Sequence, residues 1–170
     1  MIKRRIILLF VFFSYLTVSK TQDMDNEKLG AILYTLSDQI EGQEGGWQFM
    51  IDSVIFICVT DEFNNRMRVI SPIIEVKDVP NSTLEKCMEA NFHSALDARY
   101  AISDGLIWAA YIHPLKEHSK DQVISAVSQV YSCVLTYGTL YSSGELAFPK
   151  QENQTTPEEN TPSTRPVQKF

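Results

Sequence analysis

The sequence predicts an α+β domain in which helices pack on an antiparallel five-stranded sheet. Three observations support this fold class. First, apolar residues recur at helical spacing in three separate segments. Second, strand-like apolar runs lie between these segments. Third, most of these runs are joined to the next run by a turn, with no helix between them. The expected element order is α-βββ-α-ββ-α. A doubly wound parallel sheet is not expected, because it requires helices to alternate with single strands.

The first helix is expected between Asp25 and Gly42, because Leu29, Ile32, Leu33, Leu36 and Ile40 recur at spacings of three and four. Three strands should follow. The first is in GWQFMI, and the second is the β-branched and nearly continuous run VIFICVT. The third is RMRVISPIIEV, reached through the turn DEFNN. Its Pro72 indicates an edge strand or a bulge, since proline donates no backbone hydrogen bond.

A second helix is expected from Ser82, which stands in capping-box register with Glu85. Its predicted inward stripe consists of Leu84, Cys87, Met88, Asn91 and Phe92. The runs LDARYAIS and LIWAAYIHP flank Asp104-Gly105, a dipeptide typical of β-hairpins. The last helix should begin at a second capping-box pair, Ser119 and Gln122, and run to about Tyr141.

The two ends of the chain differ from this domain, which is expected over residues 23–147. Residues 1–19 contain three basic residues and then an apolar run of thirteen, a pattern typical of a cleaved signal peptide. An uncleaved N-terminal anchor is the alternative. We expect export to the periplasm or the extracellular space, with no stable membrane span after cleavage. Residues 148–170 are rich in proline, threonine and glutamate, which predicts a disordered tail.

Charge and cysteine content limit the possible partners. The formal charge is −6, and it becomes −9 once the three basic residues of the signal peptide are removed. An acidic domain is repelled by nucleic acid, so nucleic-acid binding is not expected. The cysteines Cys58, Cys87 and Cys133 match no zinc or redox spacing and suit buried apolar positions. One disulfide with one remaining thiol stays possible, and the pair cannot be chosen from the sequence.

No arrangement of residues predicts catalysis. His93, His113 and His118 lack the spacing of a metal site, and no nucleophile elbow or phosphate-binding loop occurs. The Asp61-Glu62 pair fits turn chemistry at least as well as acid–base work. We therefore expect a protein that is not an enzyme, with no metal or cofactor. The alternative is a small-ligand-binding protein or enzyme, with Trp47, Tyr100, Trp108 and Tyr111 lining a pocket between sheet and helix.

The last helix carries more apolar surface than one sheet contact requires. One stripe, formed by Val123, Val127, Val130, Val134, Tyr137 and Tyr141, is the expected sheet contact. A second stripe of Ile124, Tyr131 and Leu135 is our candidate partner-binding surface. It could equally contact the first helix, a second subunit or a bound segment. If it is interior, the partner surface should lie at a sheet edge near Pro72.

The element order, the segments LEKCMEANF and ARYAISDGLIWAAYIHPL, and the closing amphipathic helix resemble the type III secretion chaperone-like fold, in particular its YbjN-type (bacterial sensory transduction regulator) members. Asn91-Phe92, Asp104-Gly105 and Pro114-Leu115 occupy the positions of that group's helix end, hairpin and turn. The resemblance spans roughly residues 24–145. It implies a non-catalytic, often dimeric module that binds a protein segment. A signal peptide departs from that family, whose secretion chaperones work in the cytoplasm.

Overall fold

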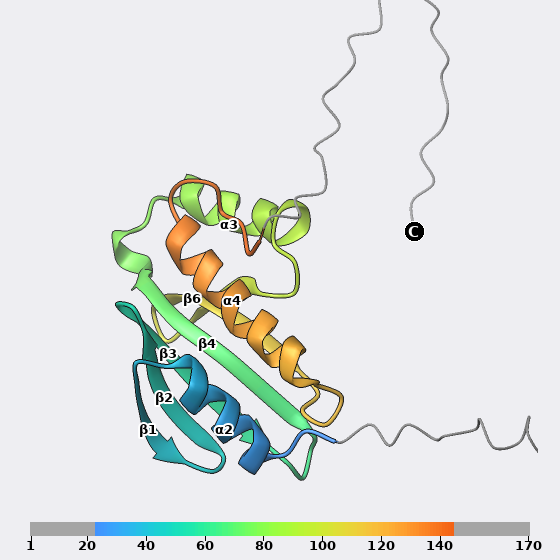
Figure 1. Cartoon of the computed structure of the whole chain (residues 1–170). Helices are drawn as coiled ribbons and strands as arrows, with labels where there is room; N and C mark the ends of the chain where they lie inside the picture. Colours follow the sequence, from blue (N-terminus) through green and yellow to red (C-terminus); the bar gives the residue numbers. More distant parts are fainter. Residues whose placement is uncertain (1–22, 145–170) are drawn as a thin grey trace, which may run out of the picture.

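The computed structural model describes residues 23–144, which form three helices and a six-stranded antiparallel sheet (Figure 1). The helices are α2 (Asn26–Leu36), α3 (Asn81–His93) and α4 (Lys120–Thr136). In spatial order, the strands are β1 (Gln39–Gln43), β2 (Gly46–Ile51), β3 (Val54–Asp61), β4 (Arg66–Glu75), β6 (Leu106–His113) and β5 (Arg99–Ser103). A 3-10 turn, η1 (Val76–Asp78), follows β4. The predicted signal peptide and disordered tail lie outside the described residues.

The α+β class is confirmed, but the predicted count of five strands is wrong. The first helix ends at Leu36, and Ile40 belongs to an additional strand, β1, that pairs with β2. The glycines taken as a helix stop form the β1–β2 hairpin instead. Gly42 has a φ of +116°, and a Cβ there would lie 2.3 Å from the Gly46 carbonyl oxygen. Only glycine fits so close a backbone approach, and the element order is therefore α-ββββ-α-ββ-α.

The helices cover one face of the sheet. In Figure 1, α2 (blue) and α4 (orange) lie on the same side of the strands, α2 beside β1 and β2, and α4 along β4. The side chains beneath them form the core, together with Leu29, Leu33, Val123 and Val130 of the two helices. On the strands this covered face consists of Trp47, Phe49, Phe56, Cys58, Met67, Val69, Tyr100, Ile107, Ala109 and Tyr111.

The three cysteines lie in this interior as free thiols, which confirms the apolar alternative. Burial raises the pKa of the Cys58 and Cys133 thiols to about 12. A thiol at such a pKa stays protonated at neutral pH and is a poor nucleophile. Neither cysteine is therefore suited to nucleophilic chemistry.

Pro72 lies on an interior strand, because β4 is flanked by β3 and β6. The predicted bulge is confirmed by a shift in register between Pro72 and Ile74, whereas the alternative of an edge strand is wrong. A proline can occupy an interior strand where a bulge already interrupts the ladder. No edge of the described sheet therefore lies near Pro72, and the alternative partner surface predicted at such an edge is wrong.

One of the two capping boxes predicted from the sequence is present in the structure. The Ser119–Gln122 capping box is formed, although α4 ends at Thr136 rather than near Tyr141. The box predicted at Ser82 and Glu85 is wrong, because Pro80 occupies the N-cap position and α3 begins two residues earlier than predicted. The predicted inward stripe of α3 is wrong in part. Cys87 is buried, but Met88 is 61% exposed and Phe92 is 80% exposed.

Candidate functional site

The face of the sheet opposite the helices is apolar and accessible, and we call it the open face. Strand side chains alternate between the two faces, so the register assigns its members directly. Ile112 is 59% exposed, and Val59 and Ile55 are also exposed. The apolar members of the open face are Met50, Ile55, Ile57, Val59, Ile70, Pro72, Leu106, Trp108, Ala110 and Ile112.

Many of these residues are cross-strand neighbours, although Arg68 separates Val59 from Ile112. Ile57 pairs with Ile70, and Ile70 pairs in turn with Ala110, while Met50 pairs with Ile55. An antiparallel sheet with one solvated face normally carries polar residues there. A contiguous apolar patch on a soluble domain instead marks a place where another molecule binds. The open face is therefore the candidate functional site.

Arginines border the apolar rows, although acidic residues outnumber basic ones about two to one in residues 23–144. Arg66 and Arg68 project from β4 on the open face, opposite Asp61 and Val59 of β3. Both arginines are exposed, and neither makes an ion pair with another described residue. The Asp61 carboxylate accepts hydrogen bonds from the backbone and side-chain nitrogens of Asn64. The arginines thus remain available to an incoming carboxylate.

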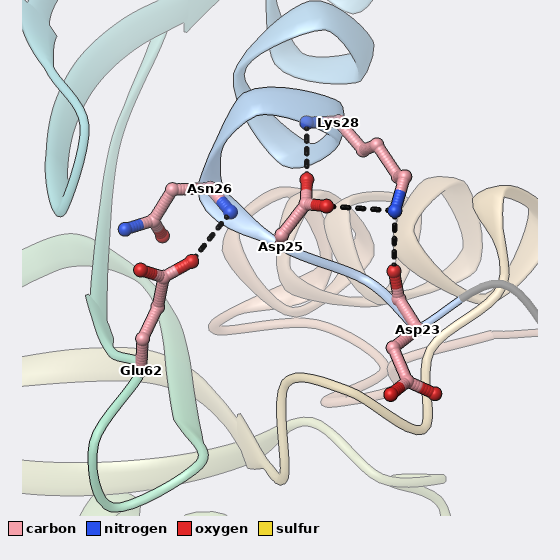
Figure 2. A network of polar contacts seen from close by, with 5 residues as sticks. All are labelled: Asp23, Asp25, Asn26, Lys28 and Glu62. Carbon is pink, nitrogen blue, oxygen red and sulfur yellow. Dashed lines mark hydrogen bonds and ion pairs between the residues drawn. The ribbon is translucent and has the colours of Figure 1, made fainter.

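The Asp61-Glu62 pair has a structural role. Glu62 Oε1 accepts a hydrogen bond of 3.0 Å from the Asn26 backbone N–H at the start of α2 (Figure 2). Beside it, Asp25 caps the helix by accepting from Lys28 N at 2.9 Å, and the Lys28 ammonium lowers the pKa of the Asp25 carboxyl. Carboxylates at a helix N-terminus satisfy backbone donors that would otherwise lack partners. This network joins α2 to the β3–β4 turn.

The residues predicted as a partner-binding stripe on α4 are separated in the structure. The Tyr131 hydroxyl donates a hydrogen bond of 2.6 Å to Asp52 Oδ2, and its ring stacks on Phe56 at a centroid distance of 6.4 Å. Ile124 is half-buried against the core, whereas Leu135 is 59% exposed. Two of the three side chains thus have partners within the domain. A role in partner binding stays a prediction for this stripe.

The four aromatic residues considered for a ligand pocket do not converge. Trp47, Tyr100 and Tyr111 lie on the covered face, whereas Trp108 lies on the open face and donates from Nε1 to the Ser103 carbonyl oxygen. A separate cleft of about 910 Å³ lies between α2 and the start of α4. Polar groups lining this cleft bond to the protein itself, among them Lys28 with Asp25 and Glu117 with Asn65. The predicted pocket lined by all four aromatic residues is therefore not formed.

His118 is a buried, hydrogen-bonded residue in the loop between β6 and α4. Its Nδ1 bonds the Pro114 carbonyl oxygen at 2.8 Å, so Nε2 is left to accept from the Tyr111 hydroxyl at 3.0 Å. The ring of His113 lies 4.4 Å away between centroids. Within residues 23–144, no group of three histidine, cysteine or acidic side chains could hold a metal ion. Burial lowers the pKa of His118, because the charged imidazolium loses solvation.

This buried imidazole predicts a loss of stability in mild acid. Because its pKa is lowered in the folded state, the unfolded chain binds the proton more readily below the ordinary histidine pKa of about 6.5. The free energy of unfolding should therefore fall as the pH drops from about 6.5 to about 5, before most carboxylates titrate. Urea unfolding across this range measures the slope. His118→Gln should flatten it and the exposed His113→Gln should keep it; equal slopes in wild type and His118→Gln would contradict the assignment.

Comparison with known proteins identifies the fold. No family model matches the chain, and no curated sequence matches it. Among solved structures, the Yersinia pestis type III secretion chaperone SycH, in complex with a fragment of YscM2, gives a TM-score of 0.51. The identity is 18%, over 66% of this chain and 98% of that one. The domain has a type III secretion chaperone-like fold.

The structure of the ExsC–ExsE complex is similar at a TM-score of 0.50, with 10% identity over 65% of this chain and 92% of that one. The domain thus spans nearly the whole length of the chains it matches. At such low sequence identity, the similarity establishes the fold alone. The resemblance drawn from element order is confirmed at this level. No described helix of the domain is long and apolar enough to span a membrane.

Proposed function

We propose that this chain is a non-catalytic protein-binding module that holds a segment of another protein against its open face. The observation that carries the proposal is the second apolar face of the sheet, which the helices leave accessible. The chaperone-like fold supports it, because the SycH structure is a complex with a fragment of a second protein. Within the fold class, we also propose kinship with the YbjN-type members that the sequence resembles.

The chemistry of the open face describes the segment that it suits. Rows of isoleucine and valine bury apolar side chains, and such burial is the main favourable contribution to association. Arg66 and Arg68 at the border can pair with carboxylates, and such complementarity selects partners and speeds their encounter. The bound segment is therefore apolar with flanking aspartate or glutamate residues. A basic segment would be attracted to the rest of the acidic domain but repelled at this border.

Site-specific photo-crosslinking tests the proposal. A photoreactive phenylalanine analogue replaces Ile112 on the open face or, as a control, Leu135 on the outer side of α4; both residues are 59% exposed. Export stays a prediction from residues 1–19, so the envelope and cytoplasmic fractions of the native cells are both analysed. We expect crosslinks from position 112 to an apolar segment with acidic flanks in another protein, and none from position 135.

Two outcomes would contradict the proposal. Equal crosslinking from both positions would show that the open face is not selective. Crosslinks from position 112 to a second copy of this chain would assign the open face to a homodimer, as the sequence also allows. Mass spectrometry of the crosslinked peptides distinguishes these outcomes, because it identifies both partners of each linkage.

A further inference from the structure

A second apolar surface lies between α3 and β5, away from the open face. It is a groove of about 260 Å³, and we call it the α3–β5 groove. No charged side chain lines it, and two of its members, Met88 and Ile102, are largely exposed. The lining residues are Leu84, Cys87, Met88, Tyr100, Ala101, Ile102 and Ile107. An apolar side chain is the occupant that such a lining favours.

The strand beside this groove has a partly occupied edge. β5 is the last strand of the sheet, and the Asn91 side chain of α3 pairs with the outward N–H and carbonyl of Tyr100, at 2.7 and 2.9 Å. Backbone groups alternate in direction along an antiparallel strand, so the N–H and carbonyl of Ile102 also point away from β6. A peptide running past Asn91 could pair with them and enter the groove with its side chains.

The described chain ends next to this edge. The Ser94 hydroxyl donates to the Tyr141 carbonyl oxygen at 2.6 Å, and the Leu96 N–H donates to Ser143 Oγ. These contacts fix residues 141–143 beside the segment that leads into β5. The Tyr141 ring also lies 6.0 Å from the ring of Tyr100, which lines the groove. The residues that follow Gly144 therefore begin close to the groove.

The next residues are Glu145-Leu146-Ala147-Phe148, with two large apolar side chains at alternate positions. In an extended segment these two side chains point the same way. Four extended residues cover about 13 Å, and Ile102 lies about 7 Å along β5 from Tyr100, the groove residue whose ring is next to Tyr141. We infer that residues 145–148 dock along the β5 edge and place Leu146 and Phe148 in the α3–β5 groove. The occupant is this chain's own segment, whatever protein binds the open face.

Cys87 provides a reporter for this docking. It lines the groove, whereas the other two thiols are fully buried in the core. In the full chain we compare alkylation of Cys87 by N-ethylmaleimide between wild type and a Leu146→Asp/Phe148→Asp variant. If the segment occupies the groove about 90% of the time, the variant should react about tenfold faster. A matched control, Val167→Asp/Phe170→Asp, changes two later apolar residues and should react like wild type.

Two different results would contradict the docking of residues 145–148. Equal alkylation rates in the wild type and the Leu146→Asp/Phe148→Asp variant would show that the segment does not cover Cys87. A wild-type rate that falls as protein concentration rises would show that a second copy fills the groove, because docking within one chain does not depend on concentration. Circular dichroism of the variant should match that of wild type. A match shows that faster alkylation does not come from altered folding. Crosslinking at position 112 tests the open face separately, so either proposal can fail alone.

Discussion

Replacing Ile112 by glutamate is expected to weaken binding of the captured protein segment by at least ~30-fold, the effect of losing an interface hot spot of about 2 kcal/mol or more. Ile112 is 59% exposed, pairs with Arg68 of β4, and lies two residues along β6 from Ala110, the neighbour of Ile70. A carboxylate there must be desolvated when the segment binds. The free energy of unfolding should change by less than about 0.5 kcal/mol, as at most exposed sites.

Leu135→Glu is the matched control, because Leu135 has the same exposed fraction but lies on α4, on the other side of the sheet. Its dissociation constant should equal that of wild type. Isothermal titration calorimetry with a synthetic peptide of the crosslinked segment measures both variants. A loss of affinity in Leu135→Glu with wild-type affinity in Ile112→Glu would move the binding surface to α4, where the sequence predicted it.

Tyr131→Glu is expected to lower the free energy of unfolding measurably, because the hydroxyl loses its hydrogen bond to a charged group and the ring loses its stacking partner. The substitution removes the bond to Asp52 and the stacking on Phe56, and it adds a negative charge beside Asp52. Tyr131→Phe keeps the ring and should cost less. Urea unfolding at neutral pH gives these values.

The same measurement distinguishes the two interpretations of the second α4 stripe. Wild-type stability of Tyr131→Glu together with lost association would restore that stripe as an intermolecular surface. Loss of stability in Tyr131→Glu, with none in Leu135→Glu, would show that the stripe is divided into an interior part and a solvated part.

The sequence predicted most elements because local chemistry determines them. The turn at Asp104-Gly105 and the capping box at Ser119 act over a few residues, and both are formed. The β1–β2 hairpin was missed because Ile40 fits a helical period as well as a strand. What decides between them is the pairing of Ile40 with Phe49 and the close approach of Gly42 to Gly46. Strand pairing through a glycine turn thus overrides the helical periodicity.

The open face was also missed, although a signal for it was present. The run VIFICV is apolar at every position and VISPIIEV at all but two, a pattern typical of strands buried on both faces. The domain covers only one of these faces, and the sequence does not state which elements lie over a sheet. Together, the two observations support our proposal that a partner covers the second face. The role of Asn91 at the edge of β5 was equally unpredictable, because its pairing with Tyr100, nine positions away, is known only from the fold.

Hydroxyl-radical footprinting of the complex tests the central claim most directly. Oxidation of reactive side chains reports their access to solvent, and such side chains occur on both surfaces of the domain. If a segment binds the open face, oxidation of Met50 and Trp108 should fall when the partner peptide is added, while that of Met88 and Phe92 on α3 stays unchanged. Protection of Met88 and Phe92, with Met50 and Trp108 oxidised as in the free protein, would contradict the account.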